Sequence, residues 1–168
     1  MRDVLPVEEY QPRSELIVPE HHVAHARYPA IDAHNHLPMT HPRLQGVDLG
    51  QLVREMDLVN VAAIVNLSGG TGDELKQNLA SLDFAHPGRF ATFCNVDWAG
   101  LGGPGWTERA VAQLQADVQA GARGLKIFKD LGLRVRDDKD ELVRPDDPRL
   151  ADLWDQAGEL GVPVLIHT

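Results

Sequence analysis

The sequence predicts an α/β fold in which parallel strands alternate with helices. Five short apolar runs are separated by four segments whose apolar residues recur at helical spacing. Each unit takes about thirty residues, the length that a strand, a crossover helix and two loops need. Because such crossovers are right-handed, the strands are expected to form a parallel sheet. They should begin near Ala30, Val61, Phe90, Gly124 and Val162.

Two of the expected strands carry the pattern most clearly. Residues 61–67 are apolar almost to their end, as expected of a parallel strand covered on both faces. In residues 30–36 (AIDAHNH), side chains repeat every second position, so Asp32, His34 and His36 should share one face. A proline precedes this strand and another follows it, which places both histidines at its carboxyl end.

Each expected helix has a start signal in the sequence. These signals are Asp48 as a cap, Thr71 in a capping box with Glu74, Thr107 as a cap, and Asp147 followed by a first-turn Pro148. Glycines at positions 121 and 161 should end the third and fourth helices. The sequence therefore predicts four helices between five strands.

Two architectures fit this order: an open doubly wound sheet, or part of an eight-unit barrel. No Gly-x-Gly-x-x-Gly follows the first strand, which removes the best reason to choose the open dinucleotide-binding fold. Residues 1–28 are interrupted by three prolines, so we expect an amino-terminal arm laid over a single domain at 29–168. The arm's histidines, His21, His22 and His25, should be exposed on a loop.

Composition excludes several function classes. A net charge of -9 and a pI near 5.2 argue against binding to nucleic acid or to an anionic membrane surface. No apolar run could cross a bilayer or form the core of a signal peptide, so a cytoplasmic location is expected. Cys94, the single cysteine, should be buried, and it cannot form a disulfide within the chain.

The residues that could do chemistry stand at the expected strand ends, where a barrel places its active site. They are His34 and His36, Asn66, Asn95 and Asp97, Lys126, and His167, on strands one to five in turn. Asp32 points the same way as the first two histidines and should support them through a hydrogen bond rather than bind metal. Three neutral imidazoles suit Zn²⁺ or a similar divalent ion with an open position for water.

Three segments resemble the amidohydrolase superfamily: residues 31–36 (IDAHNH), 124–128 (GLKIF) and 163–167 (PVLIH). They most resemble its amidohydrolase-related branch, which contains aminocarboxymuconate-semialdehyde decarboxylase-like and lactonase-like enzymes. The resemblance implies a partial (β/α)8 TIM barrel with about five strands and four helices, of which residues 29–168 are the amino-terminal part. It also implies that His34, His36 and His167 bind Zn²⁺, with Mn²⁺ as the alternative.

By the same resemblance, the partner would be a small-molecule substrate: a metal-activated water would act on a small carboxylate, lactone or amide, and decarboxylation is the alternative within the family. Lys126 and Asp97 are the candidate catalytic residues. In binuclear relatives a lysine on strand four is carbamylated and bridges two metals. The branch resembled here generally uses one metal, so we expect Lys126 to pair with a carboxylate instead.

The family's further histidine on strand six and aspartate on strand eight have no counterpart in this sequence. We therefore expect a truncated chain that is inactive or incomplete by itself. The unpaired edges of its first and fifth strands should lead to a homo-oligomer or capture a missing carboxyl-terminal half-barrel. Two other readings stay open: a non-catalytic metal-binding or assembly module, and an unrelated open α/β domain whose histidines are incidental.

Overall fold

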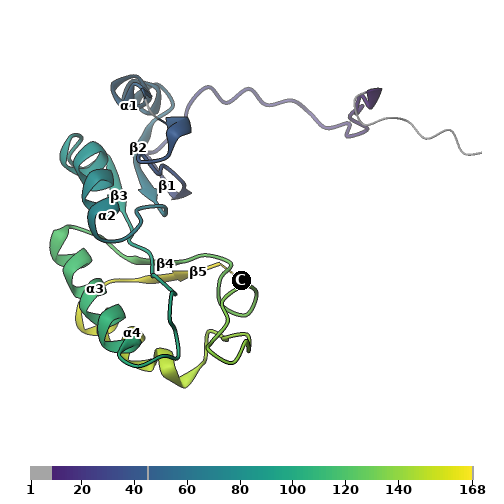
Figure 1. Ribbon diagram of the computed structural model, residues 1–168. Helices are drawn as coiled ribbons and strands as arrows, with labels where there is room; N and C mark the ends of the chain where they lie inside the picture. The colour runs from purple at the N-terminus through teal and green to yellow at the C-terminus, as the bar shows by residue number, and fades with distance from the viewer. Residues whose placement is uncertain (1–8, 45, 168) are drawn as a thin grey trace, which may run out of the picture.

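The computed structural model describes residues 9–44 and 46–167, which fold into a mixed α/β arrangement (Figure 1). The strands in this part are β1 (Ala30–Asn35), β2 (Val61–Asn66), β3 (Phe90–Thr92), β4 (Leu125–Ile127) and β5 (Val164–Ile166). The helices are α1 (Leu49–Leu58), α2 (Gly72–Leu79), α3 (Trp106–Ala120) and α4 (Ala151–Glu159). Shorter turns are η2 (Pro42–Leu44), η3 (Ala80–Phe84), which is π-helical, and η4 (Pro148–Leu150).

All strand pairs are parallel, as predicted, but the strands form two sheets instead of one. The first has the order β1-β2-β3 and the second consists of β4 and β5. A single parallel bridge between Cys94 and Leu125 joins them, with the Cys94 amide donating to the Gly124 carbonyl at 2.9 Å. The five strands therefore lie side by side in chain order.

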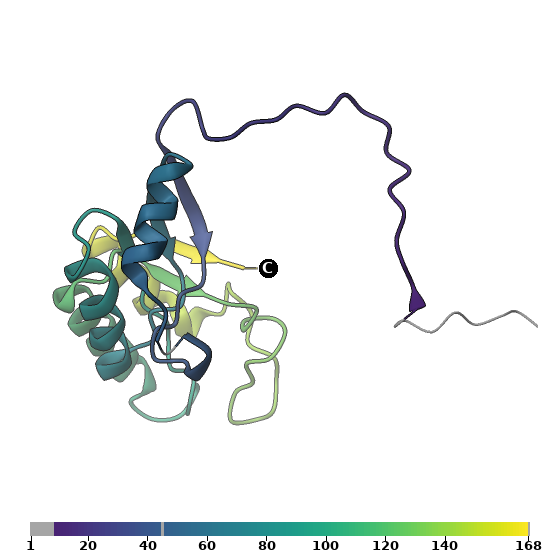
Figure 2. The same cartoon turned by 90° about the horizontal axis from the view of Figure 1, so that it is seen from above.

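The row of strands is strongly curved. With a spacing of about 4.8 Å between neighbours, a flat row would place its first and fifth strands about 19 Å apart. The imidazole of His34, on β1, nevertheless lies 6.1 Å from that of His167, which directly follows β5, measured between ring centroids. Viewed from above, the β1 and β5 arrows approach each other at their tips (Figure 2). Curvature thus draws together the carboxyl ends of the outermost strands.

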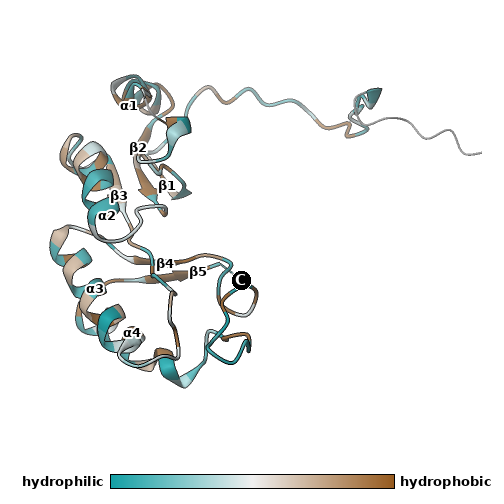
Figure 3. Ribbon diagram, viewed as in Figure 1, coloured by the Kyte–Doolittle hydropathy of each residue, from teal (hydrophilic) through white to brown (hydrophobic). Residues whose placement is uncertain are grey.

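Helices α2, α3 and α4 lie along one side of the strands (Figure 1), and two apolar clusters fill the space between the layers. The larger cluster centres on β4, α3 and α4 and includes the fully buried Leu125, Ile127 and Leu150. The smaller cluster packs Met56 of α1 against Ile64 of β2. Strands β4 and β5 are among the most hydrophobic elements of the ribbon (Figure 3).

The predicted side-chain caps are confirmed at two helices, a third lies at the predicted residue without its hydrogen bond, and the fourth is wrong. The carboxylate of Asp48 accepts a hydrogen bond from the Gln51 amide, and Asp147 caps η4 in the same way, with Pro148 at its first position. Thr71 occupies the cap position of α2 but makes no side-chain cap hydrogen bond, and the amide of Gly72 is bound by Asp117 from α3 at 2.9 Å.

The start of α3 differs from the predicted one. This helix begins at Trp106 with Gly105 in the cap position, two residues before the expected cap Thr107. Gly105 has a φ of 71°, a left-handed conformation that glycine adopts without strain. The expected cap by a threonine hydroxyl is therefore replaced by a glycine turn.

The described part of the amino-terminal arm extends away from the strands and helices instead of lying over them (Figures 1 and 2). Its last residues are tied to the domain where the Ala26 amide donates to the Val59 carbonyl at 3.0 Å. The arm histidines His21, His22 and His25 are exposed, as expected. In the part of the chain that the structure describes, no helix is long and apolar enough to cross a membrane.

Candidate functional site

Three imidazoles gather at the carboxyl ends of the outermost strands. His34 is on β1, His36 comes directly after it, and His167 comes directly after β5. The ring centroids of His34 and His36 are 5.2 Å apart, and those of His34 and His167 are 6.1 Å apart. Residues two apart on one strand face the same side, and the curved row brings the third ring to them.

The spacing of these rings can be tested against a shared zinc ion. Zinc–nitrogen bonds of about 2.0–2.1 Å in a tetrahedral site place bound imidazole centroids about 5 Å apart. The 5.2 Å between His34 and His36 meets this value, and the 6.1 Å to His167 exceeds it by about 1 Å. Within the described residues, no group of three or more His, Cys, Asp or Glu side chains is placed so that it could hold a metal ion. A shared divalent ion would require the His167 ring to move inward by about 1 Å.

Neighbouring side chains orient the first two histidines. Nδ1 of His36 lies 2.8 Å from the Ser68 hydroxyl, which leaves Nε2 of that ring free. One carboxylate oxygen of Asp32 accepts from the His34 amide at 3.1 Å, and the other accepts from the Asn35 side chain at 2.7 Å. These two hydrogen bonds, with that from Asn35 the stronger, lower the pKa of Asp32. Asp32 thus supports the strand end through both of its carboxylate oxygens.

Local electrostatics favour neutral imidazoles, the form that binds metal. Burial, followed by the charges of His34, Lys126 and His167, lowers the pKa of His36. Burial, followed by the charges of Lys129, Lys126 and His34, lowers the pKa of His167. Protons therefore compete less for these rings near neutral pH than for an ordinary histidine.

Lys126 brings a buried cation close to this group. Its side chain, from the middle of β4, is 1% exposed, and no hydrogen-bond partner for Nζ is found among the described residues. Nζ lies 5.6 Å from the centroid of the Phe128 ring, and that ring stacks on His36 at 5.5 Å. Burial lowers the pKa of Lys126, and the carboxylate of Asp130 partly opposes this effect.

The other residues predicted at strand ends have structural partners. The side-chain oxygen of Asn66 accepts from the amides of Leu37 and Ser68, and that of Asn95 accepts from the Gly70 amide. Asp97 is exposed and accepts from the Ala99 amide at 2.9 Å.

Asp97 also lines a cavity of about 200 Å³ between the β3–α3 segment, α3 and α4. Arg109 and Gln113 contribute polar groups to this cavity, and Trp106 and Leu153 contribute apolar ones. None of the described residues that line it is a histidine. The structure therefore gathers Lys126 with the three histidines and places Asp97 in a different cavity.

A pocket of about 360 Å³ opens beside the histidines, and sequence reasoning missed part of its lining. Lys129 and Asp130 had the pattern of ordinary loop residues, and nothing singled out Arg134. For Lys129 and Asp130 the available signal was their position, because they closely follow β4 at the edge where the histidines end. The described residues lining this pocket are His36, Phe128, Lys129, Asp130, Arg134 and His167.

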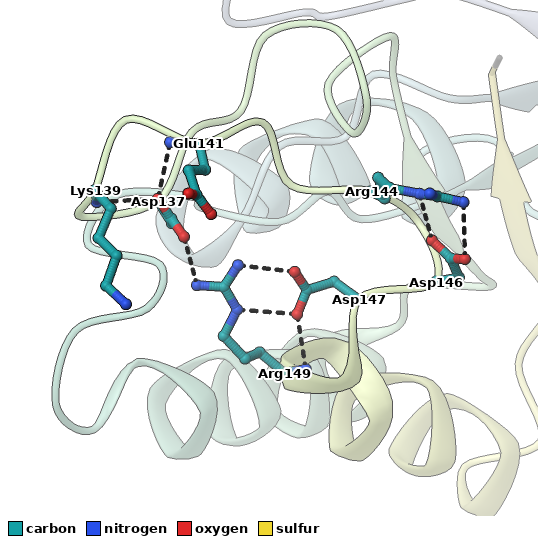
Figure 4. Close-up of polar contacts among 7 residues, drawn as sticks. All are labelled: Asp137, Lys139, Glu141, Arg144, Asp146, Asp147 and Arg149. Carbon is teal, nitrogen blue, oxygen red and sulfur yellow. Dashed lines mark hydrogen bonds and ion pairs between the residues drawn. The ribbon is translucent and has the colours of Figure 1, made fainter.

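The loop between β4 and η4 is held by ion pairs, shown in Figure 4. Arg149 binds Asp147 through two hydrogen bonds, at 2.9 and 2.7 Å, and binds Asp137 at 2.9 Å. These contacts with Arg149 lower the pKa of Asp147 to about 2. The charged run at residues 137–141 predicts a solvated surface, but the Asp137 side chain is only 5% exposed and also accepts from two loop amides. That expectation is wrong for Asp137, since it anchors the loop.

The site thus consists of three converging imidazoles, a buried lysine behind them and a loop with cationic side chains beside them. Its parts come from β1, β4, β5 and the segment after β4. Comparison of the chain with family models, with curated proteins and with solved structures finds no match.

Proposed function

We propose that this chain belongs to a metal-dependent hydrolase of the amidohydrolase-related family. His34, His36 and His167 would hold one divalent ion, Zn²⁺ in the first instance and Mn²⁺ as the alternative. The observation that carries the proposal is the convergence of three imidazoles from the first and fifth strands of the row, at 5.2 and 6.1 Å. Packing alone gives no reason for three partly exposed histidines to meet at one rim.

The strand arrangement supports a barrel-type architecture over an open doubly wound sheet. In doubly wound sheets the strand order reverses at a switch point, so the first strand lies inside the sheet. Here the order follows the chain from β1 to β5, and the carboxyl ends curve together. Sequential parallel order and curvature are the requirements of a (β/α)8 wall, whose active sites lie at this end. We propose a partial (β/α)8 fold on these grounds.

A bound divalent ion would supply Lewis acidity and a water whose pKa is lowered toward neutrality. The chain's own residues set the conditions around it. Ser68 fixes the ring of His36 through Nδ1, so that Nε2 is the nitrogen available for binding. Lys126 contributes a fixed positive charge close enough to lower the pKa values of His36 and His167. The same charge would stabilise negative charge that develops on a substrate carbonyl oxygen.

Metal content tests the proposal directly. The chain is purified without an affinity tag, loaded with Zn²⁺ or Co²⁺, dialysed and analysed for metal, with the Co²⁺ absorption spectrum reporting coordination number. We expect about one ion per chain with a four-coordinate spectrum. His34→Ala, His36→Ala and His167→Ala should each lose it. His22→Ala, an exposed histidine of the arm, is the matched control and should retain it.

Turnover separates catalysis from binding alone. The loaded chain is assayed against small lactones, amides and carboxylates, with release of acid and of carbon dioxide measured in parallel. Hydrolysis that the three histidine variants abolish would support the proposal. Metal binding without turnover of any of these substrates would favour a non-catalytic metal-binding module. Metal content unchanged in the three variants would refute the site.

A further inference from the structure

We propose that the pocket beside the histidines selects substrates that carry a carboxylate away from the reacting group, and that Arg134 and Lys129 bind this carboxylate. The inference rests on the proposed function, because it names the substrate class of the same site. Both residues lie on the loop that follows β4, and both line the pocket of about 360 Å³. A volume of this size is at the lower end of those that hold small ligands.

Arg134 differs from the other arginines of its loop and of the η4 turn that follows. Arg136, Arg144 and Arg149 each form an ion pair with an aspartate, at 3.6, 3.0 and 2.7–2.9 Å. The ion pairs of Arg144 and Arg149 appear in Figure 4. For the Arg134 guanidinium, no hydrogen bond or ion pair is found within the described residues, and its side chain lines the pocket. It is therefore the arginine here whose donors remain available to a carboxylate.

The balance of charge in the pocket opposes that of the whole chain. The protein carries a net charge of -9, with 25 acidic residues against 16 basic ones. Of the described residues that line this pocket, Lys129 and Arg134 are cationic and only Asp130 is acidic. One oxygen of Asp130 already accepts from the Trp98 indole at 3.3 Å. Two cationic side chains at this pocket give it a positive local potential, although the protein as a whole is acidic. Such a potential favours binding of an anion.

Lys126 provides a second and independent observation. Its ammonium is 1% exposed, has no partner among the described residues, and lies behind the same Phe128 ring that lines the pocket. A buried ammonium without a hydrogen-bond partner is costly unless something offsets it. A carboxylate bound in the pocket would reduce this cost.

The loop holds Arg134 in place before any ligand arrives. The carbonyl of Asp130 accepts from the amides of Arg134 and Val135 at 2.9 and 3.0 Å, forming a tight turn. Val135 is buried next to it, and the contacts of Arg149 with Asp137 and Asp147 fix the far end of the loop. Because the turn is already ordered, binding a carboxylate does not carry the cost of ordering it.

The test compares binding of succinate with binding of succinamide, its neutral analogue, at constant ionic strength. Isothermal titration is done on the full chain in zinc-loaded and in chelator-treated form. We expect succinate to bind at least tenfold more tightly than succinamide, and Arg134→Gln and Lys129→Gln each to weaken succinate binding about tenfold. Lys139→Gln is the matched control, because this exposed lysine of the same loop lies outside the pocket lining, and it should change binding less than twofold.

Each result of the succinate titrations either supports or overturns the carboxylate site. The inference is overturned if succinate binds the wild type, Arg134→Gln and Lys129→Gln with the same affinity. It is also overturned if removing the metal ion with a chelator abolishes succinate binding. Metal analysis of the same samples distinguishes failure of the carboxylate site from failure of the proposed hydrolase. Full zinc content with no dependence on Arg134 refutes the inference alone. Arg134-dependent succinate binding in a chain that never takes up metal refutes the proposed hydrolase and leaves the carboxylate site.

Discussion

Replacing Lys126 with methionine should stabilise the fold, because it removes a buried ammonium that has no partner among the described residues. An unsatisfied buried polar group costs about 1–3 kcal/mol. The contact with Phe128, at 5.6 Å, offsets about 0.5–1 kcal/mol of this cost, and a methionine sulfur would keep part of that offset. The net gain should be about 1–2 kcal/mol, which corresponds to about 3–6 °C in Tm for a chain of this length.

The effect should also depend on pH. The pKa of Lys126 is lowered in the folded protein by burial. Below its ordinary value of 10.5, the unfolded chain therefore binds more protons at this position than the folded one, and the stability of the wild type rises with pH toward 10.5. The variant lacks this rise. Its advantage should be largest near pH 7 and should narrow as the pH rises toward 10.5.

Urea denaturation of both proteins across this pH range, followed by circular dichroism, measures the difference. Lys129→Met is the matched control: it removes the same charge from an exposed side chain and should change the free energy of unfolding by less than about 0.5 kcal/mol. A Lys126→Met variant less stable than the wild type by about 1 kcal/mol or more would refute the reasoning, because it would mean that the ammonium has a stabilising partner within the fold.

Two further predictions concern the scaffold of the site. Gly69→Ala should lower the free energy of unfolding, measured by urea denaturation, by more than about 2 kcal/mol, because the new methyl would meet the Phe93 carbonyl and lie 2.7 Å from the Thr92 side chain. The control is Gly158→Ala on α4, whose new methyl meets nothing within 4 Å. This variant should be neutral or stabilise the protein by up to about 1 kcal/mol. Asp147 has a pKa of about 2 in the folded protein and an ordinary value of 3.8, so its contribution to stability is present above pH 4 and is lost as the pH falls toward 2. In Arg149→Met, the free energy of unfolding should fall less between pH 4 and pH 2 than it does in the wild type. The same fall in both proteins would contradict the role of the Arg149 contacts.

The strands and their parallel pairing could be predicted because apolar runs and crossover lengths are local properties of the sequence. The capping box at Thr71 failed for a tertiary reason. Glu74 is bound by the Thr40 hydroxyl, from the segment after β1, and Asp117 from α3 binds the amide of Gly72. Both partners are distant in the sequence, so the local pattern could not reveal them.

The histidines could be predicted because their positions depend only on strand periodicity and strand ends. Arg134 could not, because the course of its loop is set by Arg149, fifteen positions further along the chain. Asp97 was expected at the site because it follows β3. Its segment instead leads into a separate cavity, where Asp97 binds the amide of Ala99.

The bridge at Cys94 gives the protein a built-in probe. This residue joins the two sheets, its side chain is fully buried, and burial raises the pKa of its thiol to about 12. In the closed fold the thiol is both protonated and inaccessible, so an alkylating reagent can reach it only when the two sheets separate. Since Cys94 is the single cysteine, its labelling rate would report how often the curved wall opens, without any engineered tag.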